Sequence, residues 1–200
     1  MLAELHPGPA RALLFDWDGT LVDSQDANFR AMGAALAPHG LGLDQDWFDA
    51  RTGLSSADMI QALAAETGAR LTAPVEDLVA ARDRHFLANA DRIRVHPQVA
   101  EVAMAYHGTL PLAVASGGAR RIIETTMRHL SLEWLFTALV TRDEVDRGKP
   151  APDIFLRAAE ALRTAPADCL VYEDSDEGIE AARTAGMAVI DVRPVTRPRG

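Results

Sequence analysis

The stretch that decides the fold is residues 12–24, which read ALLFDWDGTLVDS. Its first four residues are apolar and do not alternate with polar ones, which is typical of a strand buried on both faces of a parallel sheet. This strand ends at Asp16, and Asp18 follows two residues later. The stretch therefore predicts a buried strand that delivers two carboxylates to one edge of a sheet.

Further apolar segments extend this pattern along the chain. They lie at 110–115, 138–140, 169–172 and 187–190. Helix-like sequence lies between them at 120–130, 153–162 and 176–185, and another helix is expected to begin near Pro97. Strands that alternate with helices indicate an α/β fold, so we expect a core built on a Rossmann-like parallel sheet.

Residues 25–91 differ from the rest because they read as helix throughout. The expected helices are 26–37, 55–67 and 73–89, and prolines and glycines punctuate the connections. We interpret this region as an inserted helical cap over the end of the sheet, with residues 1–24 and 92–200 forming the core. The tail, residues 193–200, is expected to be a loose terminus.

Composition excludes several classes of protein. Acidic residues outnumber basic ones 29 to 20 among 200 residues, and no Lys/Arg cluster offers a surface for nucleic acid. The single cysteine, Cys169, excludes a disulfide framework and is expected to be a buried structural thiol. No apolar run approaches the ~20 residues of a membrane span. Because residues 1–7 also lack a signal-peptide pattern, we expect a cytoplasmic protein.

Polar side chains follow the later strands, and a lysine precedes a helix between two of them. These residues are Ser116, Lys149, Glu173 and Asp174. Each alone has an ordinary explanation as a turn, cap or surface residue. Ligands of an open parallel sheet bind outside the carboxyl ends of its strands, so together they predict one site shared with Asp16 and Asp18.

The residue types at this predicted site favour a metal ion and a phosphate. Asp16, Asp18 and Asp174 offer the hard oxygen ligands that suit Mg²⁺. Left unpaired, these carboxylates would repel one another, and a divalent cation together with Lys149 would relieve that repulsion.

The turn after the second long apolar segment favours phosphate in a different way. Ser116 is followed by Gly117 and Gly118, whose backbone N–H groups can approach phosphate oxygens closely. The site is therefore expected to hold a phosphorylated ligand next to a metal ion.

These residues resemble the four motifs of the haloacid dehalogenase (HAD) superfamily. Residues 16–24 resemble the first motif, Ser116 the second, residues 148–155 the third and residues 173–182 the fourth. The resemblance covers nearly the whole chain. The region 25–91 resembles the four-helix cap of the β-phosphoglucomutase-like subgroup, and residues 149–182 resemble bacterial fructose-1-phosphate phosphatases.

The resemblance implies a role for each aspartate of the first motif. Asp16 would be the nucleophile that attacks phosphorus and forms an aspartyl-phosphate. Asp18 would protonate the leaving alcohol and then activate water. Because carbon–halogen cleaving members lack an acid at the position of Asp18, its presence favours a phosphatase or a phosphomutase.

The resemblance also implies the ligands of Mg²⁺ and of the phosphoryl group. The metal ion would be held by the Asp16 carboxylate, the Asp18 carbonyl oxygen and the Asp174 carboxylate, with Glu173 acting through water. Ser116, Gly117 and Lys149 would bind the phosphoryl group in transfer, where charge neutralisation matters most.

Two positions in the cap favour a phosphatase over a mutase. Asn28 stands where the resembled mutases carry His, and Ser56, in the loop around Gly53, stands where they carry the Arg that grips a second phosphate. Arg82 or Arg84 is an alternative source of that cation, but we interpret both as solvated helix residues. We therefore expect a magnesium-dependent phosphatase of small phosphorylated metabolites such as sugar phosphates, a monomer or weak dimer. A β-phosphoglucomutase-like mutase is the alternative, and a non-catalytic regulatory domain is a weaker one.

Overall fold

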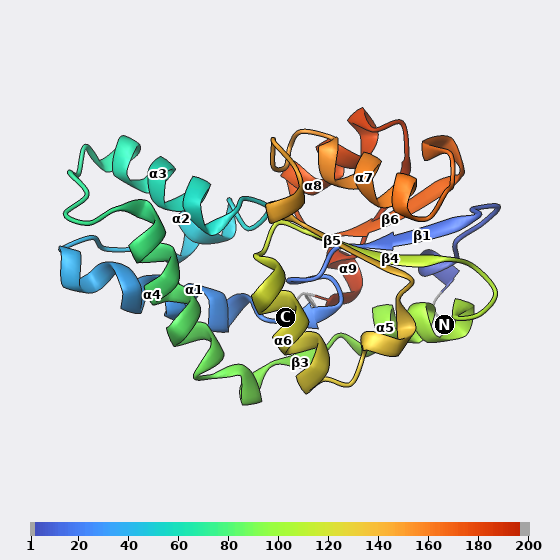
Figure 1. Ribbon diagram of the computed structural model, residues 1–200, viewed down its shortest axis with the longest axis horizontal. Coiled ribbons are helices and arrows are strands. Elements are labelled where there is room, and N and C mark those ends of the chain that lie inside the picture. The colour runs from blue at the N-terminus through green and yellow to red at the C-terminus, as the bar shows by residue number, and fades with distance from the viewer. Residues whose placement is uncertain (1–2, 197–200) are drawn as a thin grey trace.

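The core of the protein is a five-stranded parallel sheet with the strand order β5-β4-β1-β6-β7 (Figure 1). The computed structural model describes residues 3–196. The strands are β1 (Ala12–Phe15), β4 (Leu112–Ser116), β5 (Ala138–Thr141), β6 (Cys169–Glu173) and β7 (Ala188–Asp191). The predicted α/β fold is confirmed, and each predicted strand lies within two residues of an observed one.

Helices cover both faces of this sheet, which explains the unbroken apolar strands. They are α5 (Pro97–Tyr106), α6 (Arg120–His129), α7 (Asp153–Ala161) and α8 (Asp176–Thr184). Leu13 and Phe15 of β1 pack in a cluster with α5 and α6, whereas Ala12 and Leu14 pack in a second cluster with α7 and α8. Alternate residues of one strand thus supply two separate layers of core.

A second, helical body lies beyond the carboxyl ends of the strands (Figure 1). It holds α1 (Gln25–Leu36), α2 (Gln45–Asp49), α3 (Ser56–Thr67) and α4 (Val75–Leu87), and has its own buried cluster around Phe48, Met59 and Leu78. We call this body the cap. The division of the chain at 25 and 91 stays a prediction.

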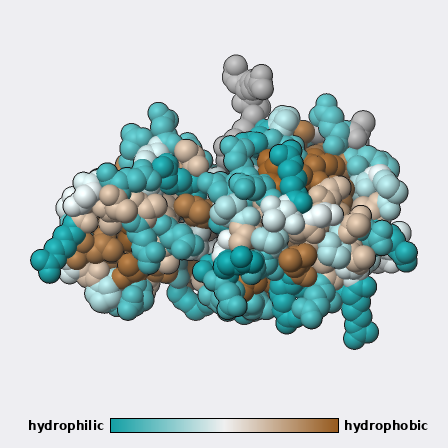
Figure 2. All heavy atoms as spheres, turned by 90° about the horizontal axis from the view of Figure 1, so that it is seen from above, coloured by the Kyte–Doolittle hydropathy of each residue, from teal (hydrophilic) through white to brown (hydrophobic). Residues whose placement is uncertain are grey.

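Two short strands join the cap to the core. β2 (Val22–Asp23) and β3 (Arg94–Val95) pair antiparallel where the chain enters and leaves the cap. Short 3₁₀ segments complete the elements: η1 (Ala3–Leu5), η2 (Ala37–His39), η3 (Ala90–Arg92), η4 (Glu133–Leu135), η5 (Arg142–Glu144) and η6 (Pro166–Asp168). Figure 2 shows that hydrophilic residues cover most of one face of both bodies, with smaller hydrophobic areas on each body.

The prediction of a loose tail was wrong for residues 193–196. They form helix α9 (Arg193–Thr196), and Arg193 makes ion pairs with Asp191 at 2.6 Å and Asp176 at 2.8 Å. The rest of that tail, residues 197–200, lies outside the described residues. Residues 1–2, part of the N-terminal segment that lacks a signal-peptide pattern, lie outside them as well. Among residues 3–196, no helix is long and apolar enough to cross a bilayer.

The cysteine prediction leads to a simple test. Cys169 is buried at the start of β6, and burial raises the pKa of its thiol to about 11. At pH 8 the thiol is therefore protonated and shielded, and we expect the native protein not to react with Ellman's reagent within an hour. In guanidinium chloride the same sample should release one equivalent of chromophore. Rapid reaction of the native protein would contradict this placement.

Candidate active site

Three functional side chains converge because their strands are neighbours. Asp16 directly follows β1, Ser116 ends β4 and Glu173 ends β6, and β1 pairs in parallel with both of the other strands. The carboxyl ends of all three strands therefore meet at one edge of the sheet. All three side chains are buried.

Lys149 reaches this edge from the loop before α7. Its Nζ donates to Asp16 Oδ1 at 2.6 Å and to Glu173 Oε1 at 2.5 Å, and its side chain is buried. Burial alone favours the neutral amine, but the carboxylates of Asp16 and Glu173 raise the pKa of Lys149 above its ordinary value. Lys149 is therefore a fixed positive charge beside Asp16.

The negative charge of the carboxylates of Asp16, Glu173 and Asp174 exceeds the positive charge of Lys149. Burial raises the pKa of Asp16 well above its usual range; Lys149 lowers it, and Glu173 and Asp174 raise it further. One oxygen from each of these three carboxylates lies within 4.8 Å of the others. An all-oxygen set with excess negative charge fits a hard divalent cation such as Mg²⁺, which would keep Asp16 ionised.

The geometry of the loops holds these carboxylates in place. Thr20 Oγ1 donates to Asp174 Oδ1 at 3.0 Å, and Glu173 Oε2 accepts the backbone N–H of Ser175 at 2.7 Å. Gly19 has φ of +83°, and a Cβ atom there would lie 2.2 Å from Asp174 Oδ2. Only glycine can both adopt that backbone conformation and leave room for the carboxylate.

Asp18 occupies a different environment, part-exposed at the cavity. Its Oδ1 accepts hydrogen bonds from Ser24 Oγ at 2.5 Å and from Asn28 Nδ2 at 3.0 Å. These two donors fix the carboxylate, while within residues 3–196 its Oδ2 has no hydrogen-bond partner. The backbone oxygen of Asp18, a predicted metal ligand, accepts a hydrogen bond from Gln25 Nε2 at 3.4 Å.

Ser116 is oriented so that its hydroxyl proton stays available. Its Oγ accepts the backbone N–H of Gly118 at 3.0 Å, so the O–H is left to donate to a phosphate oxygen. Gly117 faces the cap, where an added Cβ atom would lie 3.3 Å from the backbone oxygen of Gly53. The cap loop and this core loop are therefore in close contact.

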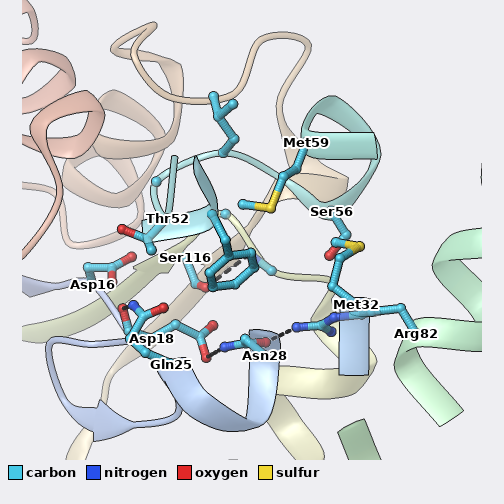
Figure 3. A pocket seen from close by; sticks show the side chains of 15 residues that line it. Asp16, Asp18, Gln25, Asn28, Met32, Thr52, Ser56, Met59, Arg82 and Ser116 are labelled. Carbon is cyan, nitrogen blue, oxygen red and sulfur yellow. Dashed lines mark hydrogen bonds between the residues drawn. The ribbon is translucent and has the colours of Figure 1, made fainter. Parts of the chain in front are cut away.

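A cavity that is open in part to solvent lies between the core and the cap (Figure 3). Six of the predicted site residues line it: Asp16, Asp18, Asn28, Gly53, Ser116 and Gly117. Lys149, Glu173 and Asp174 are buried and do not line it. Lys149 and Glu173 lie behind Asp16, joined to it through the Lys149 ammonium.

Arg82 is the residue that the sequence interpretation placed wrongly. It is buried and lines the cavity; one guanidinium nitrogen contacts Asn28 Oδ1 and another donates to Asp83 Oδ1 at 3.0 Å. A signal was present, since Arg82 is four residues from both Leu78 and Phe86, the buried face of α4. Arg84, off that face, is exposed as expected.

Comparisons with known proteins identify the family of this chain. A family model described as haloacid dehalogenase-like hydrolase matches residues 10–186. The chain belongs to this family. The curated fructose-1-phosphate phosphatase YqaB of Escherichia coli K12 is 35% identical over 191 residues, covering 90% of this chain and 95% of the relative.

Other relatives of this haloacid dehalogenase-like hydrolase include a further phosphatase. Validoxylamine A 7'-phosphate phosphatase of Streptomyces hygroscopicus subsp. limoneus is 30% identical, covering 88% of this chain and 83% of the relative. The solved structure of CbbY from Rhodobacter sphaeroides in complex with phosphate has a TM-score of 0.81 at 26% identity, covering 90% and 84%. The predicted family and the predicted class, phosphoric monoester hydrolase, are confirmed. The role of each site residue stays a prediction.

Proposed function

We propose that this haloacid dehalogenase-like hydrolase is a magnesium-dependent phosphatase of small phosphate monoesters, sugar phosphates in particular, that acts through an aspartyl-phosphate on Asp16. The observation that carries the proposal is the buried contact of Asp16 with Lys149 inside a cluster of carboxylates, with Asp18 at the same cavity. The similarity to a fructose-1-phosphate phosphatase supports the choice of substrate.

The site residues divide the reaction between them. Asp16 attacks phosphorus, and the bond from phosphorus to the alcohol oxygen breaks as a bond to the Asp16 carboxylate forms. Lys149 and Ser116 offset the charge of the phosphoryl group in transfer. Mg²⁺, held by Asp16 and Asp174 with Glu173 nearby, would supply the remaining positive charge.

Asp18 handles the protons in this scheme. Its protonated form gives a proton to the departing alcohol oxygen, and the resulting carboxylate then takes a proton from the water that hydrolyses the aspartyl-phosphate. Ser24 and Asn28 hold Asp18 Oδ1, which orients the carboxyl group for both steps. The cap must open to admit substrate and close over it to exclude water.

A substrate panel tests the proposal. Phosphate release from sugar phosphates, including fructose 1-phosphate, should require Mg²⁺ and should stop when EDTA removes the metal. Formation of glucose 6-phosphate from β-glucose 1-phosphate without free phosphate would instead establish the mutase alternative. The monomeric or weakly dimeric state and the cytoplasmic location stay predictions.

Replacing Asp174 with alanine should weaken the metal site. Because the substitution removes one of the three clustered carboxylates, the Mg²⁺ concentration for half-maximal phosphate release should rise at least about 10-fold. Asp176→Ala is the matched control, since Asp176 lies two residues later at the start of α8, but its carboxylate is exposed and pairs with Arg193 at the surface. A Mg²⁺ titration of Asp174→Ala that overlays the wild-type curve would exclude the ligand role.

A further inference from the structure

Arg82 is the cation that the cap presents to the cavity, and the structure pairs it with a buried acid. Arg82 and Asp83 are 8% and 7% exposed, and the guanidinium donates to Asp83 Oδ1 at 3.0 Å. In Figure 3, Arg82 lies on the far side of the cavity from Asp16, with Asn28 between them. A substrate whose phosphate sits at Asp16 therefore extends its leaving alcohol toward Arg82.

We propose that Asp83 determines the substrate class by neutralising Arg82. The cavity then selects phosphate monoesters whose leaving alcohol is uncharged, and rejects those that carry a second phosphate or a carboxylate. This inference rests on the proposed phosphatase function and names the substrates of the same site.

Arg121 and Arg142 also lie at the junction of cap and core, but neither lines the cavity. Arg121 of α6 lies 3.7 Å from Asp83 Oδ2, but its side chain is 65% exposed and does not line the cavity. Arg142 approaches Asp58 at 4.0 Å and donates to the backbone oxygen of Val145 at 2.7 Å. Asp83 is thus shared between Arg82 and Arg121, but water screens the charge of the exposed Arg121, and neither Arg121 nor Arg142 faces an anion held inside the cavity.

The positive charge beside Asp16 is that of Lys149, which is already paired with carboxylates. Lys149 lies between Asp16 and Glu173, where it balances the charge of the nucleophile. A second phosphate at the cap end would meet the Arg82–Asp83 pair, whose net charge is zero. Burying a dianion there, beside the Asp83 carboxylate, is unfavourable because no unmatched cation compensates it.

The rest of the cavity lining suits a polyhydroxylated alcohol. Thr52, Ser56 and Gln25 present hydroxyl and amide groups to the cavity. Met32, Phe48 and Met59 add apolar surface to the cavity lining, against which C–H groups can pack.

Fructose 1-phosphate and fructose 1,6-bisphosphate form a matched pair of probes, since they differ only in the second phosphate. We expect the wild-type kcat/KM for the monophosphate to exceed that for the bisphosphate at least about 100-fold. Equal values would overturn the inference while leaving the phosphatase function intact. Hydrolysis of neither ester, with no activity across the sugar-phosphate panel, would instead count against the proposed function.

Asp83→Asn tests the cause of this selectivity. The amide keeps the shape of the side chain but removes its charge, so the preference for the monophosphate should fall at least about 10-fold. The double variant Arg82→Gln/Asp83→Asn is neutral again and should regain the wild-type preference. A double variant that stays as permissive as Asp83→Asn would refute the charge-matching account.

Ser56→Lys keeps the test decisive if Asp83→Asn does not fold. Ser56 lines the cavity from the start of α3, so a lysine there adds a cation without breaking the buried pair. It too should lower the preference for the monophosphate at least about 10-fold. Circular dichroism and thermal unfolding confirm that each variant is folded, and an unchanged ratio in folded Ser56→Lys would contradict the inference.

Discussion

Asp16→Asn is expected to lower turnover at least about 10⁴-fold while the protein stays folded, because the amide is a poor nucleophile toward phosphorus. The substitution also removes the carboxylate that Lys149 contacts at 2.6 Å and one member of the clustered acids. The measurement is the rate of phosphate release from fructose 1-phosphate at saturating Mg²⁺. Circular dichroism and thermal unfolding follow the fold in parallel.

Asp23→Asn is the matched control for this experiment. Asp23 belongs to the same acidic stretch but is exposed on β2, outside the cavity. It should keep near wild-type turnover. An Asp16→Asn protein that retains turnover would remove Asp16 from the chemistry, and the aspartyl-phosphate with it. Loss of turnover in both variants would indicate damage to the junction between cap and core instead.

The sheet and its catalytic edge could be predicted because buried parallel strands leave a strong mark in a sequence. The unbroken apolar runs at 12–15 and 169–172 correspond to β1 and β6, and the acids that follow them reach the same edge. Every side chain of a strand buried on both faces packs in the core, so the first polar residue indicates where the strand ends. The chemistry of this edge follows from topology more than from local detail.

The short strands and the short helix have no comparable pattern in the sequence. β2 and β3 have two residues each and exist because their chain segments meet at the entrance to the cap. Helix α9 was also missed, since its four residues include Pro194 and depend on the ion pairs of Arg193. A pattern read along the chain does not contain these partners.

The structure of the cap end of the cavity could not be predicted from the sequence for a similar reason. Arg82 and Asp83 read as two ordinary charges on a helix, and their burial depends on α4 packing against α1. That packing brings the Arg82 guanidinium into contact with Asn28 Oδ1, 54 positions earlier in the chain. Sequence spacing on α4 could have indicated which face Arg82 occupies, but not that the face opens onto a cavity.

Asp18→Asn is expected to have an effect that depends on the leaving group. An alkyl alcohol needs a proton as it departs, so release of fructose from fructose 1-phosphate should slow about 10³-fold without the acid. p-Nitrophenolate is a weak base that departs without a proton, so the first step with p-nitrophenyl phosphate should slow much less. Rapid-mixing kinetics with both esters measure the two effects side by side.

The second step makes this prediction sharper. In the proposed mechanism Asp18 also activates water, so the variant should form the aspartyl-phosphate from p-nitrophenyl phosphate and then hydrolyse it slowly. We expect a burst of about one p-nitrophenolate per active site, followed by a slow steady state. Asp26→Asn, which alters an exposed carboxylate on α1 paired with Arg30, should behave like the wild type with both esters. An equal loss on the two esters without a burst would mean that Asp18 serves only to maintain the site, since misplacing the nucleophile slows every leaving group alike.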